Sequence, residues 1–163
     1  MSDYRTYTDE DGEEQEFIVF IIHGHSEDWR EIERYINKKL NFKTVVLKEN
    51  YKPGETIIEK LEEAVYEECD CAVAIMSPDD QTSDGKKRAR QNVLYEIGYC
   101  QSAYDRDGVI ILKEESVELQ SDLHGLVYIG YKKGNIGSTL AQLAEGLEEI
   151  YEEDDDDDND DDD

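Results

Sequence analysis

A carboxylate and an amide on one helical face are the residues in this chain whose types and spacing best suit catalysis. Asn92 and Glu96 lie four positions apart in the stretch RQNVLYEIG, so a helix brings them to the same face. Val93 and Ile97 belong to a different face, so Glu96 need not be part of the core. A carboxylate there can stabilise positive charge that develops in a substrate. The spacing alone is weak evidence, because a helical glutamate is usually a solvated surface residue.

Further polar groups follow apolar runs of the chain. His23-Gly24-His25 comes directly after FIVFII, and Ser77-Pro78-Asp79-Asp80 comes directly after CAVAIM. The two histidines have no additional clustered ligands, so no metal site is expected. A histidine-glycine pair also occurs in the oxyanion loop of α/β-hydrolases, but those enzymes need a G-x-S-x-G elbow, which the sequence lacks. A serine hydrolase is therefore not expected.

These residues need strands and helices to position them. Continuously apolar runs predict buried strands, and apolar residues at helical spacing predict helices between them. Asp28 with Glu31, and Thr56 with Glu59, have the spacing of helix capping boxes. The expected strands are 17–22, 44–48, 71–76, 109–112 and 126–131, and the expected helices begin near Asp28, Thr56, Arg88 and Ile136. This alternation predicts a single α/β domain with a doubly wound sheet of about five parallel strands, covered by helices on both faces.

Open parallel sheets bind ligands where the strands end at their carboxyl edge. This rule selects three loops, at residues 23–28, 49–55 and 77–92. Arg90 lies just before the helix that carries Asn92 and Glu96, and with the backbone amides around Gly24 it could hold an anionic group. The loop from Gln81 to Lys87 is polar and contains glycine, so it is expected to be mobile.

The charge distribution limits the possible partners. The net charge is −26, but much of it lies in residues 1–16 and 152–163, which are expected to form a flexible acidic arm and a disordered acidic tail around a domain at 17–151. A chain this acidic is not expected to bind nucleic acid or an anionic membrane surface. Three cysteines without C-x-x-C spacing, and no apolar run long enough to span a bilayer, predict a cytoplasmic protein.

Four blocks of sequence carry a specific resemblance. The blocks IIHGHSED, MSPDD, ARQNVLYEIGY and SDLHGLVYI, in that order, resemble the TIR-like domain of bacterial and archaeal antiviral effectors that respond to cyclic nucleotides. The resemblance covers about Phe17 to Tyr151. It implies a flavodoxin-like fold and cleavage of NAD+ as a substrate, with no cofactor, by Glu96 as the catalytic carboxylate. It also implies that the substrate lies against His23, Gly24 and His25, and that Ser77, Asp79, Asp80, Arg90 and Asn92 occupy the family's polar positions.

The resemblance implies partners as well. They are other TIR domains, through self-assembly, and a separate chain that senses the cyclic nucleotide. Pro53-Gly54 lies where TIR domains carry an assembly loop, although a simple turn has the same sequence signature. Two alternatives to an NAD+ glycohydrolase or cyclase remain open. One is a non-catalytic TIR interaction module, and the other is a nucleotide-binding protein of flavodoxin-like shape.

Overall fold

A five-stranded parallel sheet forms the centre of the computed structural model, which describes residues 3–47 and 56–157. The strand order is β4-β3-β5-β8-β9, and each neighbouring pair is parallel. The chain passes from β3 to β4 on one side and then returns to β5 on the other. The point where this order reverses lies between β3 and β5, and it is where ligands bind in open sheets.

The elements follow one another along the chain as the sequence alternation predicts. The strands are β1 (Thr6–Thr8), β2 (Glu14–Glu16), β3 (Ile18–Ile22), β4 (Lys43–Val46), β5 (Cys71–Met76), β6 (Asp80–Gln81), β7 (Lys87–Arg88), β8 (Val109–Glu114) and β9 (Ile129–Tyr131). The helices are α1 (Trp29–Lys38), α2 (Ile57–Glu63), α3 (Gln91–Tyr104) and α4 (Leu140–Asp157), with the short turns η1 (Ala64–Glu68), η2 (Ser121–Leu123) and η3 (Ile136–Thr139).

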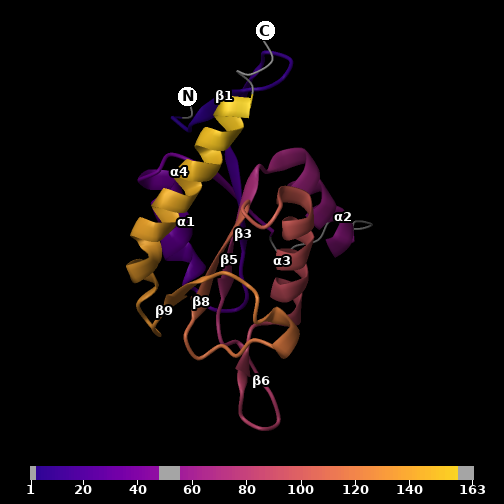
Figure 1. Cartoon of the computed structure of the whole chain (residues 1–163), viewed down its shortest axis with the longest axis vertical. Helices are drawn as coiled ribbons and strands as arrows, with labels where there is room; N and C mark the ends of the chain where they lie inside the picture. The colour runs from indigo at the N-terminus through magenta and orange to yellow at the C-terminus, as the bar shows by residue number, and fades with distance from the viewer. Residues whose placement is uncertain (1–2, 48–55, 158–163) are drawn as a thin grey trace.

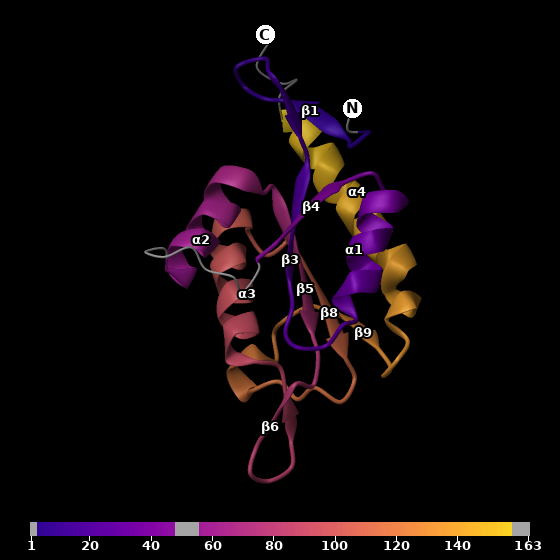
Figure 2. The same ribbon diagram turned by 180° about the vertical axis from the view of Figure 1, so that it is seen from behind.

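Helices cover both faces of the sheet (Figures 1 and 2). Along β3, Val19 and Ile21 point to the face covered by α1 and α4, whereas Phe20 points to the face covered by α2 and α3. Alternate residues of a strand face opposite sides, so a continuously apolar strand supplies two cores at once. The prediction of a doubly wound α/β sheet of five parallel strands is confirmed.

Two predicted helix starts have different outcomes. Thr56 caps α2 as predicted: its hydroxyl accepts a hydrogen bond from the Glu59 amide, and the Glu59 side chain accepts one from the Thr56 amide. The predicted cap at Asp28 was wrong, because this residue has helical backbone angles and its side chain makes no capping bond. Its carboxylate lies instead 3.5 Å from the Tyr131 hydroxyl.

Residues 3–16 form a hairpin of β1 and β2, in contrast to the expected arm that adds little to the core. Tyr7 packs against the cluster beneath α1 and α4, and its hydroxyl donates a 3.0 Å hydrogen bond to Asp70. The last helix also continues past Ile150 to Asp157, into the segment expected to be a disordered tail. A helix extends one backbone hydrogen bond at a time from turns that are already packed, and the Tyr151 hydroxyl fixes this part to the backbone oxygen of Thr6.

Candidate functional site

A cavity of about 480 Å³ opens at the carboxyl edge of the sheet, where β3 and β5 diverge. This volume is in the range of small-molecule sites. Seven of the nine predicted site residues line it: His23, Gly24, His25, Asp80, Arg90, Asn92 and Glu96. The loops after β3 and β5 and the first turns of α3 therefore meet around one space, as the parallel topology requires.

Glu96 lies on the second turn of α3 and is partly buried, on the cavity side of the helix. Burial raises the pKa of its carboxyl group from the ordinary 4.5 to about 7, and the hydrogen bond with Asn92 opposes part of that rise. Val93 and Ile97 are buried on another face of α3, as predicted, and Cys100 is buried with them. The helix thus fixes Glu96 firmly while leaving its carboxylate open to the cavity.

Asp79 ties the two loops of the site together from behind the cavity. One of its carboxylate oxygens accepts hydrogen bonds from the His25 amide at 3.0 Å and from the Ser77 hydroxyl at 2.8 Å. A methyl group at Gly24 would lie only 1.9 Å from that same oxygen. Any side chain at position 24 would therefore displace the Asp79 carboxylate from this contact. Asp79 and the fully buried Ser77 do not line the cavity, although both were expected near the substrate.

His23 has a fixed orientation at the cavity wall. Its ring stacks on the Trp29 indole, with the centroids 4.3 Å apart and the planes 14° from parallel. Its Nδ1 atom lies 2.7 Å from the Gly24 carbonyl oxygen, which can only accept a hydrogen bond, so Nδ1 carries the proton. The other ring nitrogen is left for a partner outside this contact.

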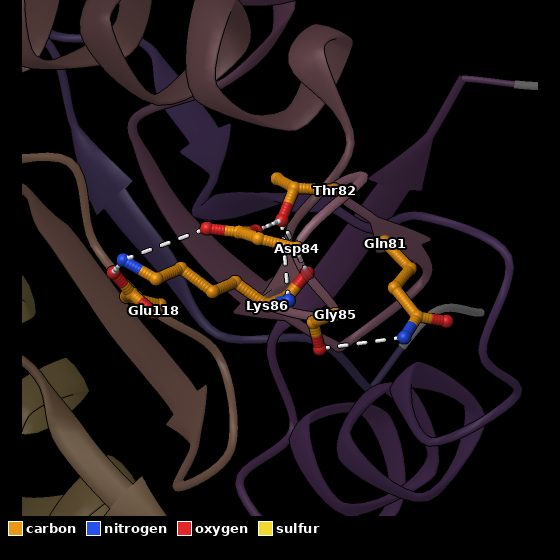
Figure 3. Close-up of polar contacts among 6 residues, drawn as sticks. All are labelled: Gln81, Thr82, Asp84, Gly85, Lys86 and Glu118. Atoms are coloured by element: carbon orange, nitrogen blue, oxygen red, sulfur yellow. Dashed lines mark hydrogen bonds and ion pairs between the residues drawn. The ribbon is translucent and has the colours of Figure 1, made fainter.

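The segment between β5 and α3 forms a β-hairpin, so the expectation of a mobile loop over Gln81 to Lys87 does not describe it. β6 and β7 are antiparallel, and the turn is closed by bonds from the Lys86 amide to the Thr82 hydroxyl and from Gln81 to the Gly85 carbonyl (Figure 3). Lys86 also forms a 3.0 Å ion pair with Glu118. The hairpin thereby holds Asp80 at its start, and Arg90 just after its end, at the cavity.

Several other residues that line the cavity were not predicted from the sequence. Lys60 lines the cavity from α2, whereas Arg90 lines it from the position just before α3. Ile57 lies one turn before Lys60 on α2 and lines the cavity as well. Ile57 is 55% exposed, although it is a large apolar residue. No local pattern marks these residues, because their position depends on how α2 packs beside α3. The remaining missed positions are Phe20, Ile21, Leu47 and Gln91. The predicted loop 49–55, with Pro53-Gly54, lies outside the described residues.

Within residues 3–47 and 56–157 the protein has neither a metal-binding cluster nor a helix that could span a membrane. They contain no group of three or more histidine, cysteine, aspartate or glutamate side chains arranged to hold a metal ion. None of their helices has the length and apolar character needed to cross a bilayer.

Comparison with known proteins gives the family. Residues 18–133 match the family described as CAP12/Pycsar effector protein, TIR domain. The chain is 37% identical over 116 residues to the uncharacterized protein YuaY of Escherichia coli strain K12, covering 68% of this chain and 38% of that protein. It is 36% identical to protein tirC of Dictyostelium discoideum, covering 74% and 67% of the two chains.

A third relative is the Pycsar effector protein PaPycTIR of Pseudomonas aeruginosa, 32% identical over 110 residues that cover 62% of this chain and 35% of that protein. The chain thus spans little more than a third of YuaY and PaPycTIR and about two thirds of tirC. With the family match over most of its length, and with the five-stranded parallel sheet that the fold requires, this chain belongs to the TIR domains of CAP12/Pycsar effector proteins.

Proposed function

We propose that this chain cleaves NAD+ at the bond between nicotinamide and ribose, as a defence effector that is active when several copies assemble. The observation that carries the proposal is Glu96, a partly buried carboxylate that shares a 480 Å³ cavity with the His23-Gly24-His25 loop. Membership of the Pycsar effector TIR family supports the same activity.

The chemistry needs only one carboxylate. Nicotinamide leaves NAD+ as a neutral molecule that takes both electrons of the glycosidic bond, so the leaving group requires no proton. Positive charge then develops on the ribose, and the Glu96 carboxylate stabilises it while accepting hydrogen bonds from the ribose hydroxyls. A water molecule attacks the ribose carbon and loses a proton, which gives ADP-ribose. Attack by another atom of the same nucleotide gives a cyclic isomer instead.

The cavity also supplies groups for the rest of the substrate. Lys60 on α2 and Arg90, just before α3, both line the cavity, and guanidinium and ammonium groups are the usual partners of a diphosphate. Leu47 and Ile57 offer apolar surface. Ser77 and Asp79 have a supporting role in this proposal, because they hold the loop that carries His25.

The test is release of free nicotinamide from NAD+ by the purified chain, at high protein concentration or with a crowding agent. We expect Glu96→Gln to lower turnover by at least about 100-fold, the usual effect of removing a group that stabilises transition-state charge. Glu145→Gln, on the exposed side of α4, is the matched control and should leave turnover unchanged. Equal turnover of Glu96→Gln and the parent chain would reject the assignment.

A second candidate function is a non-catalytic interaction module. Three large side chains, Ile58, Tyr66 and Tyr95, are each more than half exposed on α2, η1 and α3, and Tyr99 stacks on Tyr95. Exposed groups of this kind occur at protein interfaces. Absence of nicotinamide release under assembling conditions, together with self-association, would favour this function.

A further inference from the structure

The imidazole of His23 is held at the cavity wall with one ring nitrogen unprotonated. Its Nδ1 atom donates to the Gly24 carbonyl oxygen at 2.7 Å, so in the neutral ring Nε2 carries only a lone pair. Stacking on Trp29 covers one face of the ring. Within residues 3–47 and 56–157, no side chain or backbone group forms a hydrogen bond with Nε2. His23 therefore offers the cavity a hydrogen-bond acceptor.

The tautomer of His23 is fixed through a single peptide group. The peptide bond between Gly24 and His25 is trans, so its C=O and N–H point in opposite directions. The N–H donates to an Asp79 carboxylate oxygen at 3.0 Å, while the C=O on the other side accepts from His23. Hydrogen bonds in a chain polarise one another, so the carboxylate strengthens the carbonyl oxygen as an acceptor. Asp79 thus stabilises the proton on Nδ1 through the backbone.

The proposed cleavage of NAD+ releases one proton that needs an acceptor. The electron pair of the broken bond stays on nicotinamide, and the water that adds to the ribose carbon must lose a proton. Glu96 is occupied with the ribose hydroxyls at that moment. The other ionisable groups of the cavity that could accept a proton are His23, His25 and Asp80. His25 and Asp80 are exposed, whereas the His23 ring is partly buried and oriented by two contacts.

We propose that Nε2 of His23 is the base that takes the proton from the attacking water, a role that rests on the NAD+ cleavage proposed above. A lone pair of the water oxygen forms the new C–O bond, one O–H bond breaks with its electrons left on oxygen, and the proton moves to Nε2. The resulting imidazolium keeps its bond to Gly24 and lies against the Trp29 indole, which favours a cation. Loss of the proton to solvent restores the neutral ring.

The base acts after nicotinamide has left, and this order determines what its removal changes. The value of kcat/KM for NAD+ reports the steps up to the departure of nicotinamide, so it does not depend on the base. Capture of the cationic ribose by water does depend on it. A returning pyridine attacks through the lone pair of its nitrogen and loses no proton, so this competing reaction needs no base. His23 therefore determines how the ribose divides between water and a pyridine.

The experiment measures this division with NAD+ and isotope-labelled nicotinamide, as label entering NAD+ relative to ADP-ribose formed. His23→Gln keeps a polar side chain that cannot take a proton. We expect it to raise the ratio of exchange to hydrolysis by at least about 100-fold, the usual contribution of a general base. Without added nicotinamide, kcat should fall while kcat/KM stays within about threefold of the parent value. His124→Gln, at an exposed ring beside the Leu119 carbonyl, is the matched control and should keep the parent ratio.

The nitrogen NMR signals of the His23 ring give a second measurement, made on the ligand-free parent chain. Free neutral histidine prefers its proton on Nε2. In the protein we expect the proton on Nδ1, and we expect Asp79→Ala to shift the population toward Nε2 and to raise the exchange ratio. A role of Asp79 in stability alone would move neither signal. Melting curves establish that each variant is folded.

The outcomes separate this role of His23 from the proposed function. A parent chain that releases no nicotinamide rejects the function and the role together. A parent chain that releases nicotinamide, with His23→Gln at the parent ratio, overturns the role of His23 alone. A proton on Nε2 in the ligand-free chain has the same consequence. An equal rise of the ratio in Asp80→Asn would place the base at Asp80 instead.

Discussion

The carboxyl group of Glu96 has a higher pKa than that of an exposed helical glutamate. Burial raises the pKa of its carboxyl group to about 7, so near neutral pH the ligand-free protein contains both protonated and ionised forms. A carboxylate that is costly to ionise is stabilised when a positive charge develops beside it. The partly buried position of Glu96 on α3 therefore suits stabilisation of a cationic ribose better than a fully solvated surface position would.

The pH dependence of the proposed reaction follows from this pKa. Only the ionised carboxylate stabilises the cation, so we expect kcat/KM for NAD+ to be constant above pH 8 and to fall about tenfold per pH unit well below pH 7. The value of kcat/KM reports groups of the free enzyme, so the midpoint should lie near pH 7. Nicotinamide release measured from pH 5 to 9 gives the curve. A midpoint near 4.5, the ordinary value for glutamate, would contradict the burial of this carboxylate.

The same residue has a predictable effect on stability. Between pH 4.5 and 7 the folded protein holds a proton on Glu96 that the unfolded chain releases, so this group lowers the free energy of unfolding as the pH rises through that range. At pH 8, Glu96→Gln should therefore be more stable than the parent chain, by about 1 to 3 kcal/mol. At pH 4 the two should be equal. Urea unfolding at both pH values measures the difference, and a destabilised variant at pH 8 would contradict it.

At the scale of elements, the site depends on the contact between the loops after β3 and β5. Asp79 accepts one hydrogen bond across this contact, from the His25 amide, and one within its own loop, from the Ser77 hydroxyl. Gly24 leaves the space that the Asp79 carboxylate fills. The β6–β7 hairpin then leads into α3 with Arg90 at the helix start. Each loop therefore determines the position of the other, and neither alone defines the cavity wall.

Gly24→Ala should disrupt this contact. The new methyl group displaces the Asp79 carboxylate, so the bonds from the His25 amide and the Ser77 hydroxyl are lost, at a cost of about 1 to 3 kcal/mol. We expect a melting temperature lower by several degrees and at least a tenfold loss of nicotinamide release.

Two further variants control for this effect. Gly98→Ala on α3, where a methyl group meets no atom within 4 Å, should be neutral or should stabilise the helix by about 0.5 to 1 kcal/mol. Asp79→Ala removes the clashing group, so adding Gly24→Ala to it should cost little more. If the two substitutions are instead additive, the close approach is not the reason for the glycine.

At the scale of the whole molecule, the amino-terminal hairpin fastens the last helix to the sheet. The Arg5 guanidinium lies over the rings of both Phe42 and Tyr151, 4.7 and 4.2 Å from their centroids, and forms an ion pair with Glu148. Phe17 meets Tyr151 edge to face within the same group. Arg5, Phe17 and Phe42, which directly precede β1, β3 and β4, thus form one cluster with Tyr151 of the last helix.

Arg5→Ala should lower the free energy of unfolding by about 1 to 2 kcal/mol, because it removes two cation–π contacts and a partly buried ion pair. Arg30→Ala is the control. Arg30 also has an ion pair and an aromatic neighbour, Trp29, but its side chain is 62% exposed, so the loss should stay within about 0.5 kcal/mol. Urea unfolding compares the two, and equal losses would mean that the hairpin does not stabilise the domain.

The sequence by itself determined the order of the strands and helices. It also determined which loop residues directly after the strands lie around the cavity. Runs such as CAVAIM predict strands, and Val93, Ile97 and Cys100 predict the buried face of α3, because both depend on contacts within a few residues. Parallel topology then places Glu96 and the HGH loop at one edge. The tertiary structure alone decided that Asp79 supports Gly24 from 55 positions away, that Lys60 lines the cavity, and that Tyr7 and Arg5 pack with α4. These contacts depend on how whole elements pack, and local periodicity carries no information about the distance between elements that are far apart in the chain.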